Sequence, residues 1–201
     1  MTTLTPRLLL RAYQAGIFPM GHAGPDEEVI HWYAPDPRGI IPLDDFHVPS
    51  TLAQQVRQER FEVVSDRDFE AVIRACADRD RTWITPEIQQ SYIKLHEAGY
   101  AHSVECWQED DLVGGLYGVA IGGAFFGESM FYRARNTSKI ALVHLVRQMR
   151  RGGFVLLDTQ YKTEHLDQFG AIEIPRAEYE RRLAHALKVD ATWWPKDEGS
   201  S

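Results

Sequence analysis

Two polar side chains end an otherwise apolar stretch in the last quarter of the chain. Residues 154–160 read Phe-Val-Leu-Leu-Asp-Thr-Gln, a run that predicts a β-strand. Because side chains alternate faces along a strand, Asp158 and Gln160 should point the same way while Thr159 points to the other side. Two polar groups that end an apolar strand together form a candidate site. The alternative is a strand that simply turns polar as it leaves the core.

A second polar residue, Glu128, interrupts the apolar run of residues 124–131. A carboxylate inside such a strand must find a cation, a hydrogen-bond donor or water. Glu128 is therefore either a subsite for a cationic ligand or a paired structural acid.

Residues 132–139 read Tyr-Arg-Ala-Arg-Asn-Thr-Ser-Lys and precede a predicted helix. Arg133, Arg135 and Lys139 thus gather where free N–H groups and the positive end of the helix dipole attract anions. This pattern predicts a phosphate site, with a capped helix and solvated arginines as the alternative. The loop does not have the Gln/Arg-x-x-Gly-x-Gly/Ala form that acyl-CoA enzymes use for a pyrophosphate.

Apolar side chains surround these polar candidates in the sequence and could line a pocket for an apolar ligand. They are Leu116, Phe125, Met130, Leu142, Leu145 and Met149. The last three recur on one face of the helix after the basic loop. Each of the six could equally belong to an ordinary core.

The composition narrows the class of protein. The chain has 201 residues, a formal net charge of -7 and a sequence pI of about 5.6, which argue against nonspecific coating of nucleic acid, so any such contact must be local. Cys76 and Cys106 lie in apolar or helix-like stretches, which favours buried thiols and a reducing compartment. The eight histidines lack ligand spacing, so we predict no metal site. The absence of a signal peptide or membrane span places the chain in the cytoplasm.

The elements that must position these residues follow from periodicity, caps and turn residues. We predict helices over residues 5–15, 66–76, 86–98 and 139–150 and from about 176, and strands over 61–64, 102–107, 112–121, 124–131, 154–160 and 171–174. Residues 16–28 are rich in turn formers and predict a small irregular N-terminal lobe. Two prolines should make residues 31–39 rigid, which suits a segment that forms one wall of a site. The order predicts an α+β, GNAT-like fold with a mixed, mostly antiparallel sheet, packed helices and a small N-terminal lobe. We expect the lobe at residues 1–60 and the catalytic domain at 61–201.

Several blocks of the chain, covering about residues 8–176, together resemble the leucyl/phenylalanyl-tRNA-protein transferases. The blocks are YQAGIFPM (13–20), WYAPDPRG (32–39), TWIT (82–85), AHSVE (101–105), LVGGLYGV (112–119), FGESMF (126–131), NTSK (136–139) and DTQ (158–160). The chain departs from the usual family pattern where Met20 replaces Trp, Tyr132 replaces Ser, Thr159 replaces Cys and Thr163 replaces Asn. The resemblance also implies additional N-terminal sequence, rich in Gly and Leu, before the first block, and we interpret this segment as missing here.

The resemblance implies transfer of Leu or Phe, and more weakly Met, from aminoacyl-tRNA to proteins that begin with Arg or Lys, which marks them for N-degron proteolysis. It implies that the six apolar residues hold the transferred side chain and that Glu128 holds the acceptor's cationic side chain. Tyr13, Trp83 and Tyr92 would lie near the 3′-terminal nucleotide, beside the basic loop. No cofactor or metal is implied, and we expect a monomer.

The chemistry implied is aminolysis of an ester, in which Asp158 would orient and polarise Gln160 and the Gln160 amide would position the attacking amine. Because a free α-amine has a pKa of about 7.7 to 8, positioning could matter more than base strength. Two other functions remain open: an N-acetyltransferase that uses acetyl-CoA, and a non-catalytic tRNA-binding module.

Overall fold

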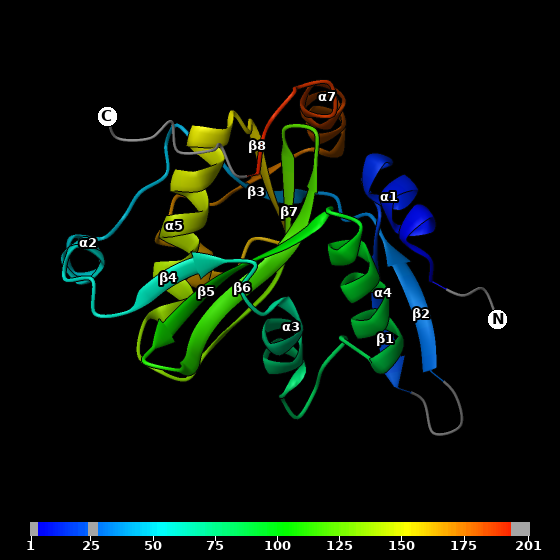
Figure 1. Cartoon of the computed structure of the whole chain (residues 1–201). Coiled ribbons are helices and arrows are strands. Elements are labelled where there is room, and N and C mark those ends of the chain that lie inside the picture. Colours follow the sequence, from blue (N-terminus) through cyan, green and yellow to red (C-terminus); the bar gives the residue numbers. More distant parts are fainter. Residues whose placement is uncertain (1–3, 24–27, 194–201) are drawn as a thin grey trace.

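The computed structural model describes residues 4–23 and 28–193 (Figure 1). A seven-stranded sheet forms its centre, in the order β4-β5-β6-β7-β8-β3-β9. The strands are β3 (Arg38–Ile41), β4 (Glu62–Ser65), β5 (Ala101–Gln108), β6 (Asp111–Ile121), β7 (Ala124–Tyr132), β8 (Leu156–Gln160) and β9 (Ile172–Ile174). Neighbouring strands are antiparallel except β7 and β8, which are parallel. The predicted α+β arrangement with a mixed, mostly antiparallel sheet is confirmed, while its likeness to the GNAT fold stays a prediction.

Seven helices of the described residues pack around this sheet. They are α1 (Pro6–Gln14), α2 (Ser50–Arg57), α3 (Phe69–Ala77), α4 (Pro86–Glu97), α5 (Thr137–Gly152), α6 (Glu164–Asp167) and α7 (Arg176–Ala186). Helix α5 covers one face of the sheet and α3 and α4 cover the other (Figure 1). The sheet separates two hydrophobic cores, one on each face. Because neighbouring side chains on a strand point to opposite faces, Phe125 and Phe126 on β7 belong to different cores.

Local capping interactions set the helix boundaries. Thr5 accepts a hydrogen bond from the Leu8 N–H, and Thr85 accepts one from the Ile88 N–H, with proline at the first helical position in both helices. The start of α5 is different: Asn136 is left-handed, with φ 68°, and its amide donates to Gln55 Oε1 instead of capping the helix. The end of α5 follows the prediction, since Gly153 is also left-handed.

The N-terminal segment is more regular than predicted. Strands β1 (Phe18–Ala23) and β2 (Glu28–Tyr33) pair antiparallel, in six-residue register, where we expected irregular structure. Prolines and glycines in this segment suggested turns, yet Pro19 and Gly21 lie within a strand. Strand β3, from the segment assigned to the lobe, pairs with β8 and β9 of the large sheet. The division at residue 60 stays a prediction.

Two further predictions concern the cysteines and membranes. Cys76 and Cys106 are both free and buried, as predicted, and burial raises the pKa of each thiol to about 12. Within residues 4–23 and 28–193, no helix combines the length and the apolar character that crossing a bilayer requires.

Candidate active site

A cavity of about 510 Å³ opens where β7 and β8 part. The two strands pair in parallel only as far as Phe126 and Asp158. Beyond that point the Gly127–Met130 stretch of β7 and Thr159 and Gln160 of β8 line the cavity. The cavity therefore follows from the sheet topology. Where the two parallel strands diverge they leave a gap, and side chains from other elements enclose it.

Glu128 enters this cavity from a β-bulge. Along the β6–β7 ladder Tyr117 pairs with Ser129 and Gly118 pairs with Gly127, which leaves Glu128 as the extra residue. A bulge bends its strand and re-aims the extra side chain. Gly118 makes this geometry possible, because a Cβ there would lie 2.3 Å from the Phe126 carbonyl oxygen. The sequence showed an acid in an apolar strand but not the bulge that turns it toward the cavity.

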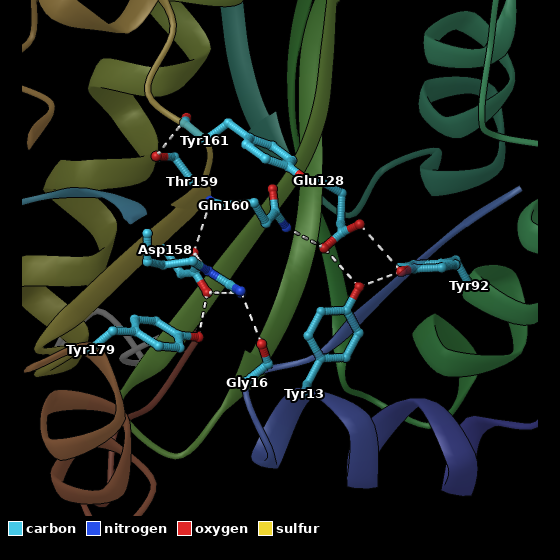
Figure 2. A network of polar contacts seen from close by, with 10 residues as sticks. Tyr13, Gly16, Tyr92, Glu128, Asp158, Thr159, Gln160, Tyr161 and Tyr179 are labelled. Atoms are coloured by element: carbon cyan, nitrogen blue, oxygen red, sulfur yellow. Dashed lines mark hydrogen bonds and ion pairs between the residues drawn. The ribbon is translucent and has the colours of Figure 1, made fainter. Parts of the chain in front are cut away.

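Three donors converge on the Glu128 carboxylate (Figure 2). The Tyr13 hydroxyl donates to Oε1 at 2.7 Å, the Gln160 amide donates to Oε1 at 2.9 Å, and the Tyr92 hydroxyl donates to Oε2 at 3.2 Å. Burial raises the pKa of Glu128 to about 7, although the two hydroxyls act in the opposite direction. Near neutral pH, both the protonated and the ionised form of this carboxyl are therefore populated.

Gln160 reaches Glu128 because β8 ends in a tight turn. The Tyr161 N–H donates to the Thr159 carbonyl at 2.6 Å, and Gln160, at the centre of this three-residue turn, has φ 60°. A left-handed conformation is unfavourable for a residue other than glycine and needs support from its surroundings. Asp158 gives that support, since its Oδ1 accepts the Gln160 main-chain N–H at 2.8 Å. The contact between the two predicted catalytic residues thus runs through the Gln160 backbone, while the amide points to Glu128.

Asp158 itself is fully buried, and only Gln160 of the pair lines the cavity. The Arg38 guanidinium holds Asp158 through two hydrogen bonds, Nε to Oδ1 at 3.0 Å and Nη2 to Oδ2 at 2.7 Å. The Tyr179 hydroxyl adds a third at 2.6 Å, and burial, followed by the Asp158 charge, raises the pKa of that phenol. Arg38 and Tyr179 were missed by the sequence analysis, because a pairing across 120 residues leaves no local pattern.

Four of the six predicted pocket residues line the cavity: Leu116, Met130, Leu142 and Leu145. The other two, Phe125 and Met149, are not among the lining residues. Phe125 is buried in the core under α5, stacked on Trp193 at 5.2 Å, and Met149 is buried in the same core, one turn beyond Leu145. Periodicity identified the correct face of α5, but it could not show where along the helix the cavity ends.

The predicted nucleotide-binding residues separate into two groups. Trp83 lines the cavity, whereas Tyr13 and Tyr92 are fully buried behind Glu128. The three cations of the basic loop are not part of the cavity wall, although Tyr132 and Ser138 of the same loop are. Arg133 Nη1 donates to the Leu112 carbonyl, Lys139 Nζ donates to Gln168 Oε1, and Arg135 is exposed away from the lining.

Comparison with known proteins identifies the family. The profile described as "Leucyl/phenylalanyl-tRNA protein transferase" matches residues 40–184, and the profile of that family's N-terminal domain matches residues 2–36. A leucyl/phenylalanyl-tRNA--protein transferase of Salinibacter ruber is 62% identical over 96% of this chain and 84% of its own length. The chain belongs to this family of aminoacyltransferases. One of Paramagnetospirillum magneticum is 54% identical over 98% of this chain and 95% of its own length.

Among solved structures, L-PGS of Bacillus licheniformis matches with a TM-score of 0.41 at 14% identity, over 77% of this chain and 53% of its own length.

All four positions at which this transferase departs from the usual family pattern line the cavity. They are Met20, Tyr132, Thr159 and Thr163. Tyr132 is 70% exposed and lies at the rim, so a bulky ring stands at the entrance where a serine is usual. The departures therefore concern the part of the transferase that would touch substrates.

Two buried side-chain atoms among the described residues lack a hydrogen-bond partner, and both belong to cavity-lining residues of the transferase. They are Tyr117 Oη and His165 Nε2. Burial, followed by the charge of Glu128, raises the pKa of Tyr117, while burial and nearby Lys139 lower the pKa of His165. Both side chains are therefore neutral at neutral pH.

A cluster outside the cavity brings together Asp66, His96 and His102, whose ligand atoms lie within 4.8 Å of one another. The sequence analysis found no such set because these residues are far apart along the chain. The Asp66 carboxylate already accepts the Ser103 N–H at 2.9 Å, His102 Nδ1 at 2.8 Å and Trp193 Nε1 at 2.9 Å. This network fixes the end of the described chain onto the sheet, and we assign it no metal.

The cavity wall also contains a cation that the sequence analysis missed. Arg79, in the loop between α3 and α4, donates from Nη2 to Ser129 Oγ at 3.1 Å and to the Met130 carbonyl at 3.2 Å. An exposed arginine in a charged Asp-Arg-Asp-Arg stretch has no sequence signal that separates it from ordinary surface.

Proposed function

We propose that this transferase moves Leu or Phe, and more weakly Met, from aminoacyl-tRNA to the N-terminal Arg or Lys of acceptor proteins in the cytoplasm. The products would be marked for N-degron proteolysis. The observation that carries the proposal is the composition of one cavity wall, where an apolar surface lies beside Glu128 and Gln160. An apolar aminoacyl side chain fits against Leu116, Leu142 and Leu145, and a cationic acceptor suits a carboxylate.

The proposed reaction joins the acceptor's α-amine to the aminoacyl carbonyl carbon. The nitrogen forms a bond to this carbon, the carbon–oxygen bond to the terminal ribose breaks, and the amine proton passes on balance to the leaving ribose oxygen. Gln160 Nε2 is occupied by Glu128, which leaves Gln160 Oε1 as the atom that can accept an N–H from the attacking amine. Orientation of this amine is the contribution that the geometry supports best.

Glu128 would bind the cationic side chain of the acceptor. Its partners are neutral phenols and an amide, so a bound guanidinium or ammonium group would supply the countercharge that the carboxylate lacks in its immediate contacts. Asp158 would act as a positioning residue, because it is buried and supports the turn at Gln160.

A transfer assay tests the proposal. Radiolabelled Phe-tRNA or Leu-tRNA is mixed with peptides that begin with Arg, Lys or Ala, and acetyl-CoA serves as an alternative donor. We expect label on the Arg and Lys peptides only, and acetylation without aminoacyl transfer would contradict the proposal. Gln160→Ala and Asp158→Ala should each lower turnover at saturating charged tRNA, and wild-type turnover in both would exclude the assigned roles.

A further inference from the structure

The loop between α3 and α4 presents a cation and an aromatic ring to the same cavity. Arg79 and Trp83 both line it, and Arg79 is the only lysine or arginine among the described lining residues. Asp78 and Asp80 are the neighbours of Arg79 in sequence, but neither forms part of the lining. At the cavity wall, this loop is therefore positively charged.

Within the described part of the chain, the guanidinium of Arg79 is held in place by hydrogen bonds from only one of its three nitrogen atoms. Both of its hydrogen bonds to β7 come from Nη2, to Ser129 Oγ and to the Met130 carbonyl. Ser129 and Met130 directly follow Glu128 and are themselves lining residues. The Nε and Nη1 groups of this exposed side chain are thus left to a ligand, in the fork geometry that suits phosphate oxygens.

The loop is anchored on both sides. The Gly21 N–H donates to the Trp83 carbonyl at 3.0 Å, and a Cβ at Gly21 would lie 2.5 Å from the Thr85 side chain. Farther along, Gln89 Nε2 donates to the Ile84 carbonyl at 3.2 Å. These contacts hold the Trp83 end of the loop, and the hydrogen bonds from Arg79 to β7 hold the other end, so a ligand that carries both a ring and an anion could bind the two side chains together.

We propose that Arg79 binds the backbone phosphate on the 5′ side of the terminal nucleotide of the tRNA, with the terminal base against Trp83. This inference rests on the proposed function. It favours nucleic acid over the acceptor peptide because a cationic acceptor is repelled by a guanidinium and attracted by Glu128, the only acidic side chain among the described lining residues. The acidic chain needs such a local cation to hold a phosphate, and Arg133 and Arg135 of the basic loop do not line the cavity.

Two small donors that differ only in this phosphate test the proposal: the phenylalanyl esters of adenosine and of adenosine 5′-phosphate. We expect the wild type to show about a tenfold lower KM for the donor with the phosphate, as suits one charge-assisted contact. Arg79→Gln should remove this preference, and Arg79→Lys should retain part of it. Arg74→Gln is the matched control, since Arg74 is an exposed arginine on α3 that pairs with Glu70. It should behave as wild type.

Uncharged tRNA gives a readout that does not depend on transfer. For Arg79→Gln, the slope of log affinity against log salt should become shallower by about one unit relative to wild type and Arg74→Gln. Equal use of both donors by the wild type, or an unchanged salt slope in Arg79→Gln, would overturn the phosphate contact. A higher KM for the acceptor peptide with an unchanged donor KM would reassign Arg79 to peptide binding. Failure of the wild type to use Phe-tRNA would instead reject the proposed function.

Discussion

Gln160 Nε2 lies 2.9 Å from Glu128 Oε1, and this hydrogen bond spans the gap between β7 and β8 at the point where their ladder has ended. A bulge on one strand and a left-handed turn on the other direct the two side chains toward each other (Figure 2). Each strand thus departs from regular geometry at the residue that reaches the cavity, as is common at functional sites.

Glu128→Gln should weaken binding of acceptor peptides that begin with Arg or Lys. Loss of a charge-assisted contact predicts an acceptor KM at least about tenfold higher, with little change in the KM for Phe-tRNA. Initial-rate assays in which each substrate is varied separately measure both constants. Equal increases in the two KM values would argue against an acceptor role.

The pH dependence of acceptor binding follows from the pKa of Glu128, about 7. The carboxylate form binds a cation better, so affinity for an Arg-initiated peptide should rise as pH increases through 7. Glu128→Gln should lose this rise while leaving any effect of the peptide's own amine in place. Titration calorimetry between pH 6 and 8 compares the two proteins, and parallel profiles would count against Glu128 as the binding group.

The same carboxyl should make stability fall with rising pH. Its native pKa of about 7 exceeds the ordinary value of 4.5, so between these values the native state binds more protons than the unfolded state. The free energy of unfolding should therefore decrease across this interval by at most about 3 kcal/mol. Solvent screening at the partly exposed carboxyl reduces this change. Urea denaturation at several pH values should show a flatter profile for Glu128→Gln. A steeper one would contradict the shift.

Arg38→Met should strongly destabilise the protein. It leaves the fully buried Asp158 without its cation, and breaking such a pair typically costs about 3–5 kcal/mol. Arg74→Met removes an exposed ion pair on α3 and should leave the urea midpoint nearly unchanged. Similar urea midpoints for the two variants would show that the buried Arg38–Asp158 pair contributes no more to stability than the exposed pair on α3.

Leu145→Phe should change the choice of transferred amino acid. The larger ring narrows the apolar part of the cavity, so kcat/KM should fall more for Phe-tRNA than for Leu-tRNA, with a change in their ratio of about tenfold. Met149→Leu is the control, because Met149 is buried on the same helix outside the cavity wall and the exchange conserves volume. An unaltered ratio in Leu145→Phe would place the pocket elsewhere.

Local signals explain which parts of the fold could be predicted. The cap at Thr85 and the stop at Gly153 depend on interactions within a few residues, and the structure has both. The β1–β2 hairpin was missed because its pairing outweighs the turn preference of Pro19 and Gly21.

The site was predictable where residue type alone indicates chemistry, as for Glu128 in an apolar strand. It was not predictable where the role of a residue depends on its contacts with residues far away in the sequence. Phe125 and Leu116 look alike in sequence, yet only Leu116 lines the cavity. Arg38 and Arg79 resemble other arginines until their partners on β8 and β7 are known.

The position of β3 bears on how the chain is made. This strand lies between β8 and β9, so its two neighbours are synthesised more than a hundred residues later. During synthesis, the Arg38 guanidinium stays solvated until Asp158 has left the ribosome. Strand β3 gains its second neighbouring strand, β9, only after Ile174 has been synthesised. The charged centre beneath Gln160 therefore cannot form before β8 has been synthesised, which makes assembly of the reaction site a contact of long sequence separation.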